Sequence, residues 1–143
     1  MIQTKAQATK EARRLFGERG CVEDRGEFLR DGTRLPRNAE ERATLNAELT
    51  QVRAAIAKAR AERPSLAAWP GNDPVWRYRD AVNDSAERLR TLRAREESLE
   101  ARLLLPRFQV MISEGWCRSI KGVGDSWDEA FANASRAAEA PHG

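Results

Sequence analysis

The residue types that most often perform catalysis or bind metals are scarce in this 143-residue chain. It contains two cysteines, Cys21 and Cys117, and one histidine, His142, the penultimate residue. A histidine so near a chain end is expected in a frayed terminus, so Ser-His-Asp and Cys-His nucleophilic catalysis are not predicted. Two thiols without a histidine ligand fall short of a zinc site, and we expect both cysteines to be buried structural residues in a reducing compartment.

The acidic residues and the one closely spaced glycine pair do not predict a reaction either. Aspartates and glutamates are plentiful, but nearly all fall on the solvated faces of expected helices, and no two stand out as an acid–base pair. Gly122 and Gly124 lack a following lysine that would hold a phosphate, so we expect a tight strand-to-helix turn there. The prediction is a protein that is not an enzyme and that needs no metal or cofactor.

The side chains best suited to binding a partner are gathered in the segment 63–79, which holds two of the four tryptophans of the chain. Tryptophan, tyrosine and arginine dominate binding energy at protein interfaces. The candidate partner-binding residues are Leu66, Trp69, Trp76, Arg77, Tyr78 and Arg79. Alternatively, an apolar cluster seals the end of a helical pair: Leu66, Trp69, Val75 and Trp76. Both interpretations hold together if one tryptophan packs inward and the other stays exposed.

Two long helices are predicted on either side of this segment. Asn38, with Glu41 three residues later, predicts a capped helix start. Along residues 38–63, apolar residues recur at alternating steps of four and three, which is typical of a coiled-coil seam, and Pro64 ends the run. The seam residues of this helix are Leu45, Leu49, Val52, Ile56 and Ala59.

Asp73 and Pro74 then form a helix start, and the same rhythm continues to Pro106. The seam positions of this second helix are Tyr78, Val82, Ser85, Leu89, Leu92, Glu96, Leu99 and Leu103. We expect helices of about 25 and about 30 residues.

Charged residues beside the seam predict how the two helices pair. Acidic residues lie on one flank of the first seam and arginines on the equivalent flank of the second: Glu41, Glu48 and Glu62, and Arg88, Arg95 and Arg102. In an antiparallel pair these flanks face each other, which joins Glu48 to Arg95. The same register joins Glu41 to Arg102. A parallel homodimer gains little beyond a pair between Glu48 and Arg53, so we predict an intrachain hairpin with its tip near residues 64–73.

The two ends of the chain predict the pieces of a small α/β domain. Residues 4–17 have helical periodicity, and residues 20–30 form one strand or a short irregular hairpin. Residues 107–113 alternate apolar and polar side chains, which is typical of a strand, and a short turn leads into another strand at 116–121.

A last helix follows, capped by Ser126 and Glu129. Its expected buried face is Ala130, Phe131, Ala134 and Ala138. We expect Trp116 and Trp127 to lie in the core or where the domain meets the helical hairpin, since large aromatic side chains are usually buried.

The predicted fold class is α+β: a small α-β-β-β-α head interrupted by a long antiparallel two-helix coiled-coil hairpin. The head comprises residues 1–36 and 106–143, and the hairpin arm comprises residues 37–105. Without the arm, the element order resembles the double-stranded RNA-binding domain. The local match is the run Gly122-x-Gly124-x-Ser126-x-x-x-Ala130-x-x-x-Ala134, which is similar to that family's strand-to-helix signature and to the closing stretch of HicB-like antitoxins.

The resemblance implies binding to duplex RNA, but the positions that would bind it are altered. In the family, lysines at the start of the last helix hold phosphates, whereas this chain has Trp127 and Asp128 there, with Asp125 just before them. Aspartates at a helix N-terminus complement its dipole and repel phosphate. The family's first β-hairpin loop, which enters the minor groove, is here the site of the inserted arm. The retained fold-forming positions favour a scaffold for protein contacts.

Charge and hydropathy narrow the class of partner further. The formal net charge is only +3, with both signs interleaved, so the chain has no basic tail of the kind that binds nucleic acid. No apolar run approaches the length of a membrane span or a signal peptide. We expect a cytoplasmic protein without a membrane partner.

Two functions from different classes remain. The first is a small interaction protein, a modulator or inhibitor of the phage or mobile-element type, that docks through the arm on a larger host protein or nucleoprotein complex. The alternative is a protein that binds duplex RNA or DNA with its head and with a set of cations: Arg88, Arg93, Arg95 and Lys121. A homodimer through the open sheet edge of the head is compatible with either.

Overall fold

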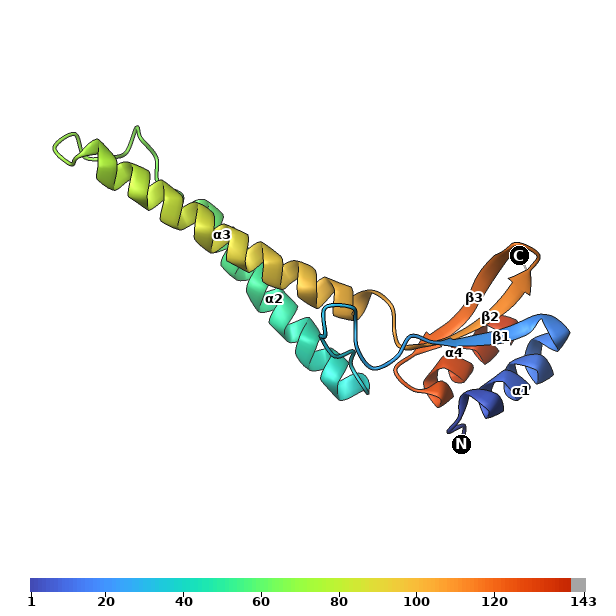
Figure 1. Ribbon diagram of the computed structural model, residues 1–143. Coiled ribbons are helices and arrows are strands. Elements are labelled where there is room, and N and C mark those ends of the chain that lie inside the picture. Colours follow the sequence, from blue (N-terminus) through green and yellow to red (C-terminus); the bar gives the residue numbers. More distant parts are fainter. Residues whose placement is uncertain (140–143) are drawn as a thin grey trace. The chain divides into compact units, whose positions relative to one another are not determined.

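Residues 1–139 fold into four α-helices and one three-stranded antiparallel sheet (Figure 1). The computed structural model describes residues 1–139, so His142 lies outside the described residues. The elements are α1 (Lys5–Phe16), a 3-10 turn (Gly17–Arg19), β1 (Gly20–Asp24), α2 (Ala39–Ala61), α3 (Val75–Leu104), β2 (Phe108–Glu114), β3 (Cys117–Gly124) and α4 (Trp127–Glu139). This mixture of helices with an antiparallel sheet confirms the predicted α+β class.

Strand β2 lies in the centre of the sheet, between β1 and β3. Val110 of β2 pairs with Val22 on one side and with Gly122 on the other. A bulge beside Val110 and Met111 leaves Lys121 as an extra residue in β3. Helices α1 and α4 cover the same face of the sheet (Figure 1). The core lies between this pair of helices and the sheet: Ala8, Ala12, Val22, Val110, Trp127, Ala130, Phe131 and Ala134.

Two glycines of β3 allow α4 to approach the sheet closely. A Cβ atom on Gly122 would lie 2.4 Å from the carbonyl oxygen of Ala130 and 2.4 Å from the amide nitrogen of Ala134. A Cβ atom on Gly124 would lie 2.6 Å from the amide nitrogen of Ala130. The predicted turn at these glycines is therefore wrong: both belong to the strand, and close contact with helix backbone is what requires them.

Strand β1 is shorter than the predicted segment 20–30. It ends at Asp24, and a separate bridge joins Phe28 to Arg34. Gly26 has φ of 85°, which interrupts the extended backbone. The carboxylate of Asp24 accepts a hydrogen bond of 2.9 Å from the amide of Gly26 and holds this turn in place.

Several side chains of the head differ in exposure from the prediction. Trp127 is buried as expected, but Trp116 is 97% exposed because it occupies the two-residue turn between β2 and β3. Cys117 is exposed because it opens the edge strand β3, and Cys21 is half-buried, so neither is a buried structural cysteine. Ala138 is exposed because it lies in the last turn of α4, whose buried face ends at Ala134.

By its internal contacts the chain divides into two units. The head unit comprises Met1–Ala43 and the chain from Arg102 onward, and the arm unit comprises Thr44–Ala101. None of the helices within residues 1–139 combines the length and the apolar character that a membrane span requires.

Helices α2 and α3 run antiparallel in the arm unit. Glu62, near the end of α2, contacts Arg88, whereas Arg53 contacts Glu96 and Glu100 farther along α3. The predicted ion pair between Glu48 and Arg95 is present, with 3.6 Å between Arg95 Nη2 and Glu48 Oε2. The buried side chains of the unit all belong to the predicted seam: Leu45, Leu49, Val52, Ile56 and Ala59 of α2, and Leu89 and Leu99 of α3. The other seam positions predicted within residues 75–101 are half-buried, except Val82, which is exposed.

The predicted ion pair between Glu41 and Arg102 is wrong. Glu41 instead binds the guanidinium of Arg37, which lies one helical turn away, and Arg102 donates a hydrogen bond to the backbone carbonyl of Arg34. The segment preceding α2 therefore supplies closer partners than the facing helix. Asn38 caps α2 as predicted, since its Oδ1 accepts a 2.8 Å hydrogen bond from the amide of Glu41.

Candidate functional site

The tip, defined here as residues 62–82, connects the end of α2 to the first turns of α3. Because Glu62 contacts Arg88, the turns of α3 before Arg88 extend past the end of α2 (Figure 1). Backbone hydrogen bonds fold the connection into turns, from the amide of Trp69 to the carbonyl of Leu66 and from the amide of Asp73 to the carbonyl of Pro70. The first turns of α3 are left without a helical neighbour.

One tryptophan of the tip is packed inward. The rings of Trp69 and Tyr78 meet edge to face, with centroids 5.5 Å apart and planes at 68°. Such a pair contributes about 0.5 to 1.5 kcal/mol beyond the area it buries. The indole nitrogen of Trp69 is buried and has no hydrogen-bond acceptor among residues 1–139. Trp69 therefore acts mainly as a packing residue of the tip.

The remaining apolar side chains of the tip face solvent. Leu66 is 65% exposed, Val75 is 76% exposed and Trp76 is 53% exposed, so these three do not form the sealing cluster considered from the sequence. Val82, which the helical rhythm predicts to lie in the seam, is also exposed, so the seam does not extend to this turn of α3. The physical reason is that α2 ends before it can cover the first turns of α3.

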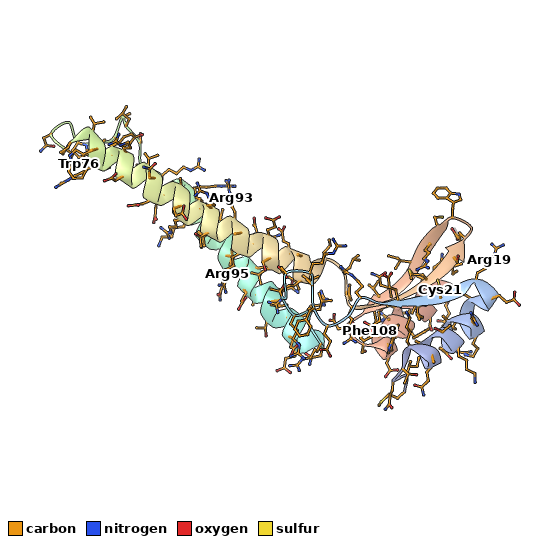
Figure 2. The ribbon with its side chains drawn as sticks, viewed as in Figure 1. Arg19, Cys21, Trp76, Arg93, Arg95 and Phe108 are labelled. Atoms are coloured by element: carbon orange, nitrogen blue, oxygen red, sulfur yellow. The ribbon has the colours of Figure 1, made fainter. Side chains whose placement is uncertain are left out.

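The arginines of the tip lie beside this apolar surface. The guanidinium of Arg77 lies over the Trp76 ring, 5.5 Å from its centroid, and contacts Asp73 at 3.8 Å. Arg79 is exposed and makes no ion pair within residues 1–139. Figure 2 shows Trp76 on the first turn of α3, away from Arg93 and Arg95. The six residues predicted to bind a partner thus lie in one segment of the arm unit, with Trp76 and its neighbours exposed.

Two grooves continue from the tip along α3 and share Arg63, Ala86 and Leu89. One, of about 230 Å³, is also lined by Pro64, Tyr78, Val82 and Ser85. The other, of about 470 Å³, is also lined by Arg90, Arg93, Ala94 and Glu97. Their shared floor is apolar, and arginines border it.

The four cations proposed for nucleic-acid binding are not brought together. Arg88 contacts Glu62 at 3.3 Å and Arg95 contacts Glu48 at 3.6 Å, so acidic neighbours already offset both charges. Arg93 borders a groove of the arm unit, and Lys121 belongs to the head unit. Arg93 and Arg95 project from different sides of α3, as expected for helical residues two apart (Figure 2).

The segment that starts α4 is bound by protein groups. Asp125, whose side chain is 1% exposed, accepts two hydrogen bonds of 2.7 Å from the guanidinium of Arg42 in the first turn of α2. Arg42 also donates to the carbonyl oxygen of Leu103, and hydrogen bonding to Asp125 raises the pKa of Arg42. No sequence pattern identifies Arg42 as a partner of Asp125, because 83 residues separate the two and no local spacing links them.

A second charged pair ties β1 to the residue before β2. Arg107 donates hydrogen bonds of 2.7 and 2.9 Å to the carboxylate of Asp24, and contacts Glu27 at 3.6 Å. The hydrogen bonds from Arg107 hold the pKa of Asp24 below its ordinary value of 3.8, and the amide of Gly26 acts in the same direction. The pair fixes the point where the chain enters the sheet from the long insertion.

We expect Asp24→Asn to remove part of the acid sensitivity of the head. A carboxylate with a lowered folded-state pKa stabilises the fold above the unfolded-state value and loses this contribution as pH falls from 3.8 through the folded pKa. The melting temperature of Asp24→Asn should therefore lie below that of wild type at pH 6, and the difference should shrink by pH 2. Thermal unfolding followed by circular dichroism measures this, with the exposed Asp80→Asn as control. A constant difference from pH 6 to pH 2 would contradict the assignment.

Within residues 1–139 there is no group of three or more histidine, cysteine or acidic side chains placed to hold a metal ion. No protein-family model matches this chain, and no curated protein and no solved structure matches it either.

Proposed function

We propose that this protein is a non-enzymatic interaction module that docks on a larger protein, or on a nucleoprotein complex, through the tip of a two-helix coiled-coil arm. The observation that carries the proposal is the position of the exposed apolar side chains. In the arm unit, the large hydrophobic side chains that are exposed all lie between residues 66 and 82: Leu66, Val75, Trp76 and Val82. Clustered exposed apolar side chains mark interaction surfaces of soluble proteins.

The composition of the tip supports docking on protein. Trp76 offers a large rigid side chain, and Arg77 and Arg79 offer donors around it, which is the combination enriched in interface hot spots. The grooves beside Val82 and Leu89 offer space for side chains of the partner. Burial of Trp76 and Leu66 against a partner supplies binding energy in proportion to the apolar area removed from water.

The coiled-coil pairing of α2 and α3 would give the tip a rigid support. The buried residues of the arm unit all belong to the seam predicted from the sequence, and the ion pairs between the helices favour the antiparallel register. A rigid arm loses little conformational entropy on docking, which favours affinity. Insertion of such an arm into a cleft of a larger assembly would modulate or inhibit it, as small phage and mobile-element proteins do.

Nucleic-acid binding is supported less well. This alternative depends on the resemblance of the element order of the head to the double-stranded RNA-binding domain, and that resemblance is itself still a prediction. The ion pairs of Arg88 and Arg95 and the buried Asp125 at the start of α4 weigh against phosphate binding at those places. Gel-shift titrations against duplex RNA and duplex DNA at about 50 and about 200 mM salt test this alternative, because phosphate contacts weaken steeply with salt.

We expect Trp76→Ala to weaken binding to the purified partner by at least about 30-fold, the effect of losing about 2 kcal/mol from a hot spot. Isothermal titration calorimetry measures the affinity, after the partner has been captured with the tagged protein and purified. Phe28→Ala is the matched control, since it removes another exposed aromatic side chain, from the head unit. Trp69→Ala is less informative, because it also removes the packing against Tyr78.

Two results would overturn this function. One is unchanged affinity of Trp76→Ala together with weakened affinity of Phe28→Ala, which would place docking on the head. The other is salt-sensitive micromolar binding to duplex RNA or DNA, which would replace a protein partner by nucleic acid. Circular dichroism spectra that match wild type are required of both variants before either affinity is compared.

A further inference from the structure

A second exposed surface lies on the head unit, along strand β3. Trp116 is 97% exposed in the turn that precedes the strand, and Ile120 is 48% exposed within it. Ile120 pairs with Met111, on the face opposite to Val110 and Gly122, which face α4. Since side chains alternate along a strand, Arg118 shares the face of Ile120.

Strand β3 is also an edge of the sheet, with β2 as its only neighbouring strand. Alternate residues along an edge strand direct their N–H and C=O groups away from the sheet, where they form a template for another strand. At the far end, the carbonyl of Val123 is occupied by a 2.8 Å hydrogen bond from the side chain of Asn133. The stretch Cys117–Lys121 has no such cover from the described residues and contains no proline.

The charged side chains along this edge indicate which kind of partner strand would be complementary to it. Arg118 and Lys121 make no ion pair within residues 1–139, whereas Arg107 and Arg42 of the same unit are both bound to aspartates. The edge therefore presents two uncompensated cations beside two exposed apolar side chains. Because Arg118 and Ile120 share one face, a complementary strand carries an acidic and an apolar residue two positions apart on the face that meets them, since cross-strand neighbours of opposite charge and of apolar type stabilise pairing.

We propose that the free edge of β3 binds an extended acidic and apolar segment of a partner protein by strand addition. Backbone hydrogen bonds to Cys117–Lys121 supply affinity, and the side chains supply selectivity. Carboxylates of the segment meet Arg118 and Lys121, and its apolar residues pack on Trp116 and Ile120. A second copy of the same edge fits less well, because two-fold pairing about Ser119 brings the two Arg118 side chains near each other.

The test is NMR titration of the full-length, 15N-labelled protein with a terminally blocked peptide in which glutamate and valine take turns at every second position, with threonine between them, flanked by Gly-Ser tails for solubility. We expect the peptide to shift the amide signals of Cys117–Lys121 and the indole signal of Trp116. We also expect it to slow hydrogen exchange of the edge amides at least tenfold. The same peptide with alternate backbone amides N-methylated should not bind, because it cannot form the ladder.

Charge reversal provides a control that does not depend on the backbone of β3. The double variant Arg118→Glu/Lys121→Glu should bind the glutamate peptide at least tenfold more weakly and should bind the corresponding lysine peptide more tightly than wild type does. A dispersed spectrum like that of wild type shows that the variant is folded. Trp76→Ala should leave this binding unchanged, so the outcome is independent of the function proposed for the tip.

Four results would overturn the inference. Edge amides that do not shift at millimolar peptide would exclude strand addition, and equal binding of the N-methylated peptide would exclude a backbone ladder. Protection of the same amides without peptide, together with a dimer in light scattering, would assign the edge to a second copy of the chain. Stronger shifts with a single-stranded oligonucleotide than with the peptide would assign the cations and Trp116 to nucleic acid.

Discussion

Arg42→Ala is expected to lower the free energy of unfolding of the head by about 3 to 5 kcal/mol, the cost of leaving a buried charge without its partner. The Asp125 carboxylate is 1% exposed and receives both of its 2.7 Å hydrogen bonds from Arg42. Removal of the guanidinium leaves these oxygens without that donor and out of reach of bulk water. It also frees the carbonyl oxygen of Leu103, which Arg42 binds at 3.1 Å.

Urea unfolding followed by circular dichroism measures this loss, and an exposed pair serves as the matched control. Arg90 and Glu87 are 75% and 67% exposed, so Arg90→Ala should change the free energy of unfolding by about 1 kcal/mol or less. The double variant Arg42→Met/Asp125→Leu should recover most of the stability, because it removes both charges together. Equal effects of Arg42→Ala and Arg90→Ala would show that the pair does not hold the head together.

Gly122→Val is expected to prevent the head from folding, and Gly122→Ala to cost about 3 kcal/mol, at the upper end of the range for overpacking. A Cβ atom at this position meets backbone atoms of α4, at 2.4 Å from Ala130 and from Ala134, and a backbone cannot move aside as a flexible side chain can. Helix α4 would have to withdraw from the sheet. That withdrawal would open the core around Val110, which is fully buried.

The control for this position is the same change at an open site. Gly71 has nothing within 4 Å of an added Cβ atom, so Gly71→Ala should leave the unfolding free energy within about 1 kcal/mol of wild type. Calorimetric melting temperatures of the two alanine variants give the comparison. A melting temperature of Gly122→Ala equal to that of Gly71→Ala would mean that α4 does not lie as close to β3 as the structure places it.

The stability effects expected for Arg42 and Gly122 help to distinguish structural residues of the head from docking residues. Arg42 and Gly122 lie in the packed part of the head, and their variants are expected to lower its stability. Trp76 and Arg118 are exposed, so a variant at either position should change binding without lowering the melting temperature. Loss of partner binding without loss of melting temperature then identifies a docking residue. Loss of both identifies a structural one.

Much of the arm unit could be predicted from the sequence because its signals are local. The cap at Asn38, the start of α3 after Pro74 and the buried seam each depend on residues within one or two turns of each other. The ion pair between Glu48 and Arg95 could be predicted as well, since a helical repeat carries its register over the whole length of the pair. The strand at 107–113 was likewise visible in its alternation.

The exposure of the candidate residues could not be predicted in the same way. Trp116 was expected to be buried because it is large and apolar, yet it occupies a two-residue turn where no other element reaches it. Val75 and Trp76 are apolar residues that could equally have packed together to seal the end of the helical pair. They are exposed to solvent because α2 ends before it reaches them. Burial depends on what lies opposite a side chain, and the sequence pattern around that side chain does not contain this information.

The sequence by itself therefore determined the α+β class, most element positions, the seam of the arm unit and the aromatic segment proposed to dock. Only the tertiary structure decided which tryptophans are exposed, that Arg42 binds Asp125, and that Gly122 must lack a side chain. The physical reason is the range of the interactions. Caps, turns and periodic faces are set by neighbours in the chain, whereas a buried ion pair or a close helix–strand contact joins segments that only folding brings together.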